Sequence, residues 1–199
     1  MIRTDIEAFA AYPNSRAWYD KLYLAKMFGY ICGTSVIPYD GKWIVRPITN
    51  LEGMGLGASI SVFHEGTIIP PDTFYCQVFG GRHITIDYVR KNNMWVQTDT
   101  FEGFNTHDNL IQFSKWKRIS FEYTLPLSMD FIESDYINIE IIGNHIIEVH
   151  LRPNPDPVMY DEFWPIWSED QLPPSDEYVR IPDRESHIGR LGFYVPKKR

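Results

Sequence analysis

The chain of 199 residues is long enough for one domain, and 44% of its residues are hydrophobic. Its 26 acidic and 19 basic residues give a net charge of −7, which argues against non-specific binding to nucleic acid. Only two cysteines are present, which excludes a disulfide scaffold, and no apolar run approaches the roughly 18 residues of a membrane helix. The first residues lack the apolar core of a signal peptide, so we expect a soluble, cytoplasmic protein.

The sequence pattern predicts a helical segment at residues 1–38. Apolar side chains recur there at helical spacing, and they form one stripe made of Trp18, Leu22, Ala25 and Phe28. Pro13-Asn14-Ser15 supplies a turn and a cap before this stripe, and Gly29 is a common end for a helix. The pattern therefore predicts one helix between Asn14 and Gly29.

Residues 39–152 predict short strands, because brief apolar segments alternate with turn residues. Lys91-Asn92-Asn93 and Gly143-Asn144 are turn sequences that predict hairpins. Gly80-Gly81 joins two strands and is either a hinge or an ordinary hairpin turn. The expected strands are residues 43–45, 60–63, 74–79, 83–89, 94–98, 119–125, 136–142 and 145–151.

Residues 153–199 have a different composition, with eight of the 14 prolines of the chain. Proline lacks the backbone N–H and fixes φ, so we expect this segment to be irregular. It also carries large apolar side chains such as Phe163, Trp164 and Trp167, which are rare in disordered tails. We therefore expect an ordered extension that wraps onto the core.

A glycine-rich loop occupies residues 50–59, with glycines at positions 53, 55 and 57. Gly53, Gly55 and Gly57 allow positive φ, so successive backbone N–H groups can surround phosphate oxygens. The spacing fits neither a P-loop nor a dinucleotide-binding fingerprint. A flexible loop without a ligand is the alternative interpretation.

The hairpin around Gly143-Asn144 carries a group of charged residues. Glu148, His150 and Arg152 share one face of a strand because side chains alternate. With a two-residue turn, Glu140 pairs with Ile147 on the neighbouring strand and lies beside Glu148. Two carboxylates and an imidazole can hold Mg²⁺. A solvated face with cross-strand ion pairs is the alternative.

Read in order, these segments resemble the ATP-grasp superfamily of ATP-dependent carboxylate–amine or thiol ligases. Ile44-Val45-Arg46-Pro47 is similar to the strand of that family that ends in a nucleotide-contacting Lys-Pro, and residues 50–59 resemble its mobile glycine-rich loop. The segment from Cys76 to Asp87 resembles its strand–hinge–strand element, and residues 148–152 its E-x-N-x-R strand. Tyr19-Asp20-Lys21-Leu22 is similar to the opening of the ATP-binding part. The likeness spans about residues 18–152.

Three positions depart from the family pattern. Arg46 replaces a lysine, Gln77 replaces an acid of the hinge, and His150 replaces a metal-binding asparagine. The resemblance implies an α+β fold of two small lobes of mainly antiparallel sheet, with few helices. It implies a nucleotide-binding core at residues 39–152 and a minimal form without the preceding substrate-side domain, which a second protein could supply.

The resemblance also implies an activity and its residues. ATP and Mg²⁺ would activate a carboxylate of a small molecule or peptide as an acyl phosphate, which an amine then attacks. The nucleotide would contact Gln77, Phe79 and His83, with Arg46 and the three glycines Gly53, Gly55 and Gly57 at its phosphates. Mg²⁺ would bind Glu140, Glu148 and His150. Catalysis would use Arg152, with Lys117 and Arg118 from the basic cluster before residue 119.

Two other functions stay open from the sequence. The first is a degenerate, non-catalytic binding or assembly protein that contacts a partner through the aromatic residues Tyr160, Phe163, Trp164 and Trp167, although packing within the chain is an alternative role for them. The second is a metal-dependent hydrolase built on Glu140, Glu148 and His150, with His83 or His145. No H-E-x-x-H motif supports the second.

Overall fold

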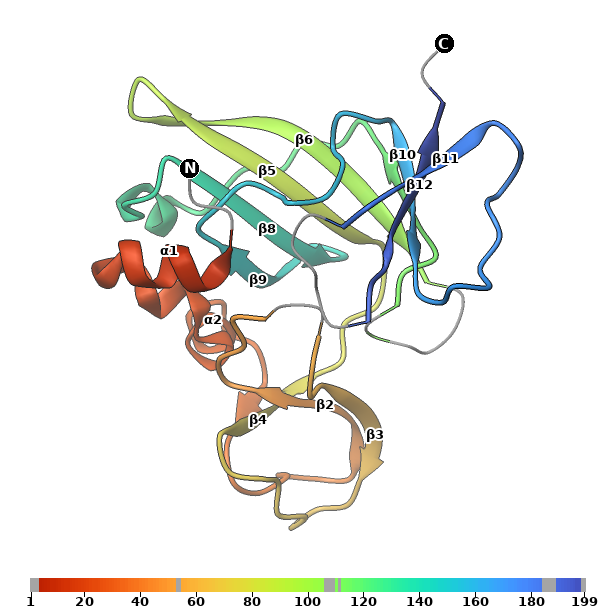
Figure 1. The fold of residues 1–199 in the computed structure, drawn as a ribbon. Helices are drawn as coiled ribbons and strands as arrows, with labels where there is room; N and C mark the ends of the chain where they lie inside the picture. Colours follow the sequence, from red (N-terminus) through yellow and green to blue (C-terminus); the bar gives the residue numbers. More distant parts are fainter. Residues whose placement is uncertain (1–3, 53–54, 106–109, 111, 184–188, 198–199) are drawn as a thin grey trace.

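The computed structural model describes residues 4–52, 55–105, 110, 112–183 and 189–197. These residues form two antiparallel sheets and a few short helices, which confirms the expected fold class. Figure 1 shows the four-stranded sheet below the eight-stranded sheet, with the N-terminal helices beside one end of the larger sheet. The helices are α1 (Asp5–Ala11), α2 (Lys21–Met27) and the 3₁₀ helices η1 (Pro13–Tyr19) and η2 (Leu127–Phe131).

The N-terminal segment contains three short helices where the sequence predicts one, so that prediction is wrong. Thr4 and Glu7 form a capping box that starts α1. Pro13 begins η1, and Asp20 then caps α2 by accepting a hydrogen bond from the N–H of Tyr23. The apolar stripe is therefore divided at Asp20. None of the helices in the described part of the chain is long and apolar enough to cross a membrane.

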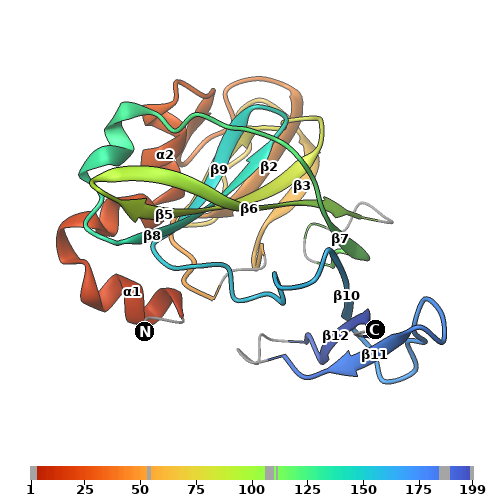
Figure 2. The same cartoon turned by 90° about the horizontal axis from the view of Figure 1, so that it is seen from above.

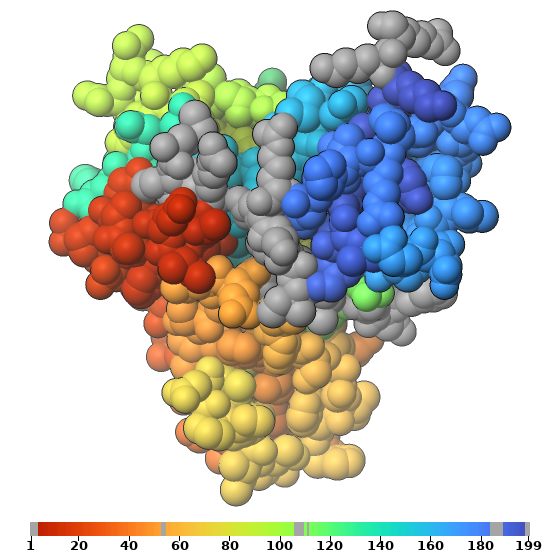
Figure 3. Space-filling model, in the orientation of Figure 1, coloured from red at the N-terminus to blue at the C-terminus, as the bar shows by residue number. Residues whose placement is uncertain are grey.

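The smaller sheet has the order β1-β4-β2-β3 and forms a distinct lobe in the space-filling view (Figure 3). Trp43, Val45 and Tyr75 belong to its small core, together with Ile37 and Ile69. Its strands are β1 (Cys32–Gly33), β2 (Gly41–Pro47), β3 (Ser59–Phe63) and β4 (Thr73–Gln77).

Gly80-Gly81 connects the two sheets, because β4 belongs to the smaller sheet and the strand that follows, β5 (His83–Lys91), belongs to the larger. The segment is thus a link between lobes, as a hinge would be, and not a hairpin turn. Gly81 has a φ of +118°, and a Cβ on it would lie 3.0 Å from Cα of Gly143. Glycine allows this close approach of the link to the β8–β9 turn.

The larger sheet has the order β11-β12-β10-β7-β6-β5-β8-β9. One face of its central strands is apolar and contributes Ile86, Ile139 and Val149 to the main core. The opposite side chains of the same strands are polar and include Thr85, Asn138 and Glu140. The strands are β5 (His83–Lys91), β6 (Met94–Phe104), β7 (Lys115–Arg118), β8 (Tyr136–Ile142), β9 (His145–His150), β10 (Glu162–Ile166), β11 (Tyr178–Ile181) and β12 (Gly192–Pro196).

The strand expected at residues 119–125 is absent, and the strand of this region is β7, just before it. The side chain of Gln97 on β6 explains the difference. Its amide donates to the carbonyl of Phe121 and accepts from the N–H of Tyr123, so a side chain replaces strand pairing there. The apolar residues of this segment pack on the main core instead.

The C-terminal extension, residues 153–199, was expected to be irregular. It instead contains three strands, β10, β11 and β12, among its described residues. β10 pairs with β7, so these strands continue the larger sheet (Figure 2). Pro165 lies within β10 opposite Phe193. Phe163 is fully buried against Phe101 and Phe193, which anchors the extension to the sheet.

Candidate active site

A cavity of about 630 Å³ lies between the two sheets. The smaller sheet contributes Ile44 and Arg46 to its wall, and the larger contributes Glu140 and Glu148. The C-terminal extension closes part of another side. Cavities of roughly 300–1,000 Å³ are typical of small-molecule sites. Further lining residues are Lys21, Gly55, Gly81, Arg82, His83, Glu102, Phe113, Trp116, Asp156, Trp167 and Arg190.

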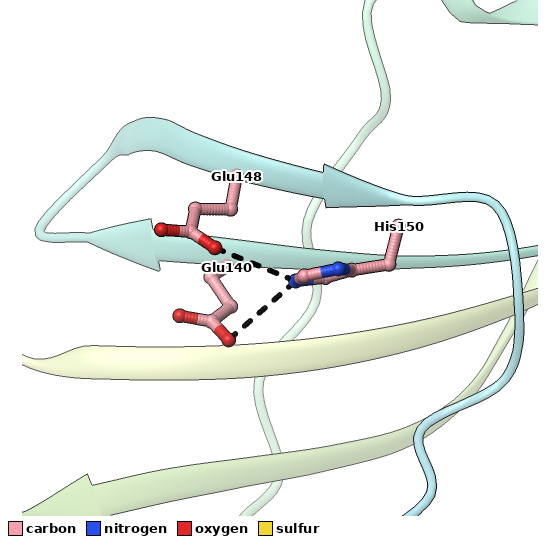
Figure 4. A group of neighbouring side chains, drawn as sticks. All are labelled: Glu140, Glu148 and His150. Carbon is pink, nitrogen blue, oxygen red and sulfur yellow. Dashed lines mark ion pairs between the residues drawn. The ribbon is translucent and has the colours of Figure 1, made fainter. Parts of the chain in front are cut away.

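The β8–β9 hairpin brings the two carboxylates together. Its turn is Gly143-Asn144, as predicted, since Ile142 pairs with His145. The predicted pairing of Glu140 with Ile147 is wrong, because the register shifts between Glu140 and Ile141 and places Glu140 directly opposite Glu148. A β-bulge adds one residue to one strand and changes which side chains share a face. Figure 4 shows both carboxylates turned toward the imidazole of His150.

Glu140, Glu148 and His150 form a cluster that fits a divalent cation. One ligand atom from each of the three lies within 4.8 Å of the others. Atoms on opposite sides of a bound Mg²⁺ are about 4.2 Å apart, so small side-chain rotations bring this set to coordination distance. Two carboxylates provide the oxygen ligands that Mg²⁺ prefers.

Asp5 orients His150 from behind the cluster. Oδ2 of Asp5 lies 2.9 Å from Nδ1 of His150, so Nε2 points to the carboxylates, 3.8 Å from Glu140 and 3.7 Å from Glu148. Burial lowers the pKa of His150, but Asp5 and Glu140 outweigh it and raise the pKa to about 10. The imidazole therefore carries a proton that a metal would displace.

Three further basic side chains contact the carboxylates. Nζ of Lys21, at the start of α2, lies 2.5 Å from Oε1 of Glu148, and Nη1 of Arg46 lies 3.6 Å from the same oxygen. Nε2 of His83 lies 2.9 Å from Oε2 of Glu140. Burial would raise the pKa of Glu140, but its interactions with His150 and His83 hold it well below its usual range. Arg46 also donates to the carbonyl of Ile147, so it joins the two sheets.

Arg152 does not line the large cavity but lies deeper. Its Nη2 donates to Asp5 across 2.8 Å, and Asp5 also accepts from the hydroxyl of Tyr19. Arg152 lines a smaller cavity of about 80 Å³ with Glu140 and His150. The residue is therefore placed to hold the groups that orient the cluster, through Asp5.

A second buried carboxylate extends this polar network. Asp87 on β5 accepts hydrogen bonds from the side chain of Asn138 and the N–H of Asn154. Burial raises its pKa to about 7, although both hydrogen bonds act in the opposite direction. Below that pH the group is neutral, which burial favours.

The large cavity is not lined by Gln77, Phe79, Lys117 or Arg118, which the sequence predicts to contact the nucleotide or take part in catalysis, nor by Arg152 or Gly57. The side chain of Gln77 accepts from the N–H of Ile31, and the ring of Phe79 stacks on His145 at 4.1 Å. Lys117 is exposed, and Arg118 pairs with carboxylates of Asp99 and Asp161.

The glycine-rich loop reaches the cavity through Gly55. Gly55 and Gly57 have φ of +62° and +74°, the conformation that favours glycine. A Cβ on Gly57 would lie 3.0 Å from the ring of Pro47, so this glycine packs the loop on β2. Gly53 lies outside the described residues.

Sequence reasoning missed four residues of the site. Lys21 could have been predicted, because it belongs to the segment that resembles the opening of the ATP-binding part. Asp5 gave no signal, since its site partners His150 and Arg152 lie more than 140 residues away in sequence. Trp116 and Trp167 also line the cavity, but they are far apart in the sequence, and no motif links the two segments.

Comparison with known proteins gives no match by sequence and several by structure. No model of a protein family matches the chain, and no curated protein sequence matches it. Carboxyaminoimidazole ribonucleotide synthase from Aspergillus clavatus, in complex with ATP, is similar with a TM-score of 0.58 at 8% identity; 96% of this chain and 73% of that chain are covered.

Two other structures are similar over 92% of this chain, each at 12% identity. One is N5-carboxyaminoimidazole synthetase from Staphylococcus aureus in complex with ADP, with a TM-score of 0.54 and 69% of that chain covered. The other is a protein from Archaeoglobus fulgidus assigned to the ATP-grasp superfamily, with a TM-score of 0.53. This chain spans 65% of the length of the Archaeoglobus protein. At these identities the likeness shows a shared fold.

Proposed function

Because this chain has the ATP-grasp fold, we propose that it binds ATP with Mg²⁺ between its two sheets and is an ATP-dependent ligase. A small-molecule or peptide carboxylate is activated as an acyl phosphate, and an amine then displaces the phosphate. The observation that supports this most is the convergence of Glu140 and Glu148 with Lys21 and Arg46 in one cavity. The carboxylates suit the metal and the cations suit phosphates.

Each residue has a role in this proposal that follows from its position. Glu140, Glu148 and His150 would hold Mg²⁺, which neutralises charge on the phosphates when it is bound. Lys21 and Arg46 exchange their contacts with Glu148 for phosphate oxygens. The loop at Gly55 covers the phosphates with backbone N–H groups. The walls of the cavity described here come from both lobes of this chain.

The carboxylate substrate attacks the terminal phosphoryl group of ATP directly, the bond from that phosphorus to the bridging oxygen breaks, and ADP leaves. No nucleophilic side chain of the protein is needed, because the reaction depends on positioning and on electrostatic stabilisation. Arg152 acts indirectly, because it binds Asp5 and Asp5 fixes the orientation of His150. The direct catalytic role that the resemblance implies for Arg152 is therefore not part of the proposal.

Thermal unfolding with nucleotide tests this function. A ligand present at 100 times its Kd stabilises the folded state by about 2.7 kcal/mol, so ATP with Mg²⁺ should raise Tm by about 5 °C or more. ATP with a chelator and Mg²⁺ alone are the controls, and each should give a much smaller shift. No shift with millimolar ATP and Mg²⁺ contradicts the proposal.

A second candidate is a catalytically degenerate binding protein of the same fold. One observation favours it: Lys21 and the protonated His150 already neutralise the carboxylates that would hold a metal. Such a protein would bind ATP equally well with and without Mg²⁺. Of the aromatic residues expected to contact a partner in this case, Phe163 is fully buried and packs within the chain.

A further inference from the structure

Part of the wall of the large cavity is formed by residues that the proposed function does not use to hold the phosphates or Mg²⁺. The C-terminal extension forms much of this part, which we call the aromatic chamber, through Asp156 and Trp167. Phe113 and Trp116, from the segment that leads into β7 and from β7 itself, complete it. The chamber and the carboxylate cluster belong to one continuous cavity, so a molecule in the chamber lies next to the proposed reaction centre.

The rings of the chamber are packed in fixed positions. The centroids of Phe113 and Trp116 are 4.5 Å apart, and the indole N–H of Trp167 donates to the carbonyl of Phe113 across 2.7 Å. A Cβ on Gly103 would lie 2.7 Å from Phe113 and 2.8 Å from Trp116, so this glycine leaves the room that the rings occupy. His83, which contacts Glu140, packs edge-on against Phe113.

Asp156 provides a carboxylate beside these rings. It lines both the large cavity and the small one that it shares with Glu140, and its side chain is 12% exposed. Nη1 of Arg190 lies 3.0 Å from Oδ1 of Asp156. Arg190 is fixed in turn by Asp183, at 2.7 Å, and by the ring of Phe193. Asp156 is therefore held in place from the protein side.

The charges of the chamber favour a cation over an anion. Among the described residues around it there are three carboxylates, those of Glu102, Asp156 and Asp183, and two guanidinium groups, those of Arg82 and Arg190, which pair with them. This excess of negative charge disfavours an anionic group. An ammonium group, in contrast, is attracted both by a carboxylate and by the faces of aromatic rings.

We infer that the aromatic chamber binds the amine substrate, with its ammonium group at Asp156 and its apolar part against Phe113, Trp116 and Trp167. This inference rests on the proposed function, since it gives the second substrate of that reaction a place. It also gives the C-terminal extension a role, which is to form the amine subsite. The substrate class is a primary amine that carries an aromatic or other apolar group.

Binding of 2-phenylethylamine to the full chain, followed by calorimetry, tests the inference. Phenylacetate has the same ring with the opposite charge, and 2-phenylethanol has no charge. The amine should bind, and Asp156→Asn should weaken its binding about tenfold or more, because a charge-assisted hydrogen bond is lost. Phenylacetate and 2-phenylethanol should bind about tenfold more weakly than the amine.

Asp183→Asn is the matched control. Asp183 contacts the same arginine but does not line the cavity, so this variant should keep the affinity for the amine. Equal losses in Asp156→Asn and Asp183→Asn would mean that only the position of Arg190 matters, and would overturn the inference. Absent binding to the unaltered protein, or a preference for phenylacetate, would overturn it as well.

Trp167→Leu provides a second test that leaves Asp156 and its partners intact. It should also weaken binding of the amine, and unchanged affinity contradicts the proposed place of the apolar part. The thermal shift with ATP and Mg²⁺ is measured on every variant. A normal shift without amine binding refutes the subsite alone, whereas amine binding without that shift refutes the proposed function and leaves the subsite.

Discussion

The two ends of the large cavity are built in different ways. At the charged end, Glu140, Glu148 and His150 are held by buried ion pairs and by Asp5 behind them. At the aromatic end, the rings are held mainly by packing, with one hydrogen bond from Trp167 to Phe113. The comparison indicates that the side chains of the charged end, the proposed metal and phosphate site, are held by ion pairs, whereas the rings of the aromatic end, the proposed amine subsite, are held by packing.

The largest effect is expected at the charged end. Glu148→Gln removes a carboxylate of the proposed metal site and should weaken binding of ATP in the presence of Mg²⁺ by about 10- to 100-fold. Affinity without Mg²⁺ should change little. Calorimetric titration with and without the metal measures both values. Glu122→Gln, at an exposed position away from the large cavity, is the control and should bind as the unaltered protein does.

The buried support of the charged end gives the next prediction. Asp5→Ala leaves Arg152 and His150 without their buried partner, so the free energy of unfolding should fall by about 3–5 kcal/mol. Tyr19→Phe removes only the hydroxyl that donates to Asp5 and should cost about 1 kcal/mol. Urea unfolding measures both. Similar small losses in the two variants would show that Asp5 is not the central support.

The same network predicts a pH dependence. The folded pKa of Asp87 is about 7, above the usual 3.8, so the folded state binds more protons between these values. Its contribution to stability is therefore present near pH 4 and is lost as the pH rises through 7. Asp87→Asn lacks this change, so between pH 4 and 8 its free energy of unfolding should gain about 2–4 kcal/mol relative to the unaltered protein. Parallel pH profiles would contradict the effect of burial.

The link between the lobes gives a smaller effect. Gly143 has a φ of +62°, and a Cβ on it would lie 2.8 Å from the carbonyl oxygen of Gly80. Gly143→Ala should therefore lower the free energy of unfolding by about 1–3 kcal/mol. Gly80→Ala is the matched control, because a Cβ there meets nothing within 4 Å. Equal effects of the two substitutions would show that the close approach is unimportant.

The smallest effect is expected at the aromatic end. Trp167→Phe keeps a ring but loses the hydrogen bond to the carbonyl of Phe113, so stability should fall by about 1 kcal/mol. Binding of ATP with Mg²⁺ should be unchanged, since the two ends are held separately. A loss of nucleotide affinity as large as that of Glu148→Gln would remove the distinction between the ends.

How much of this could be predicted from the sequence also differs between the ends. The charged residues of the β8–β9 hairpin lie close together in the chain, and alternation on a strand placed Glu148 and His150 on one face. The bulge that sets Glu140 opposite Glu148 has no sequence signal, because register depends on packing of the whole sheet.

The aromatic end could not be predicted, because Phe113, Asp156 and Trp167 come from separate segments. The strands of the C-terminal extension were not predicted, because proline argues against a strand and Pro165 nevertheless lies within β10. Near the N-terminus, a continuous apolar stripe predicted one helix, although the helix is interrupted at Asp20. There the N–H of Lys21 donates to the carbonyl of Ile48, a contact that only the folded chain provides.

The most direct test is a crystal structure of the protein with Mg²⁺ and a non-hydrolysable ATP analogue. The account predicts the triphosphate between the two sheets, with Lys21 and Arg46 at its oxygens and the metal at Glu140 and Glu148. Nucleotide bound elsewhere, or a metal that leaves both carboxylates paired with Lys21 and His150, would contradict it.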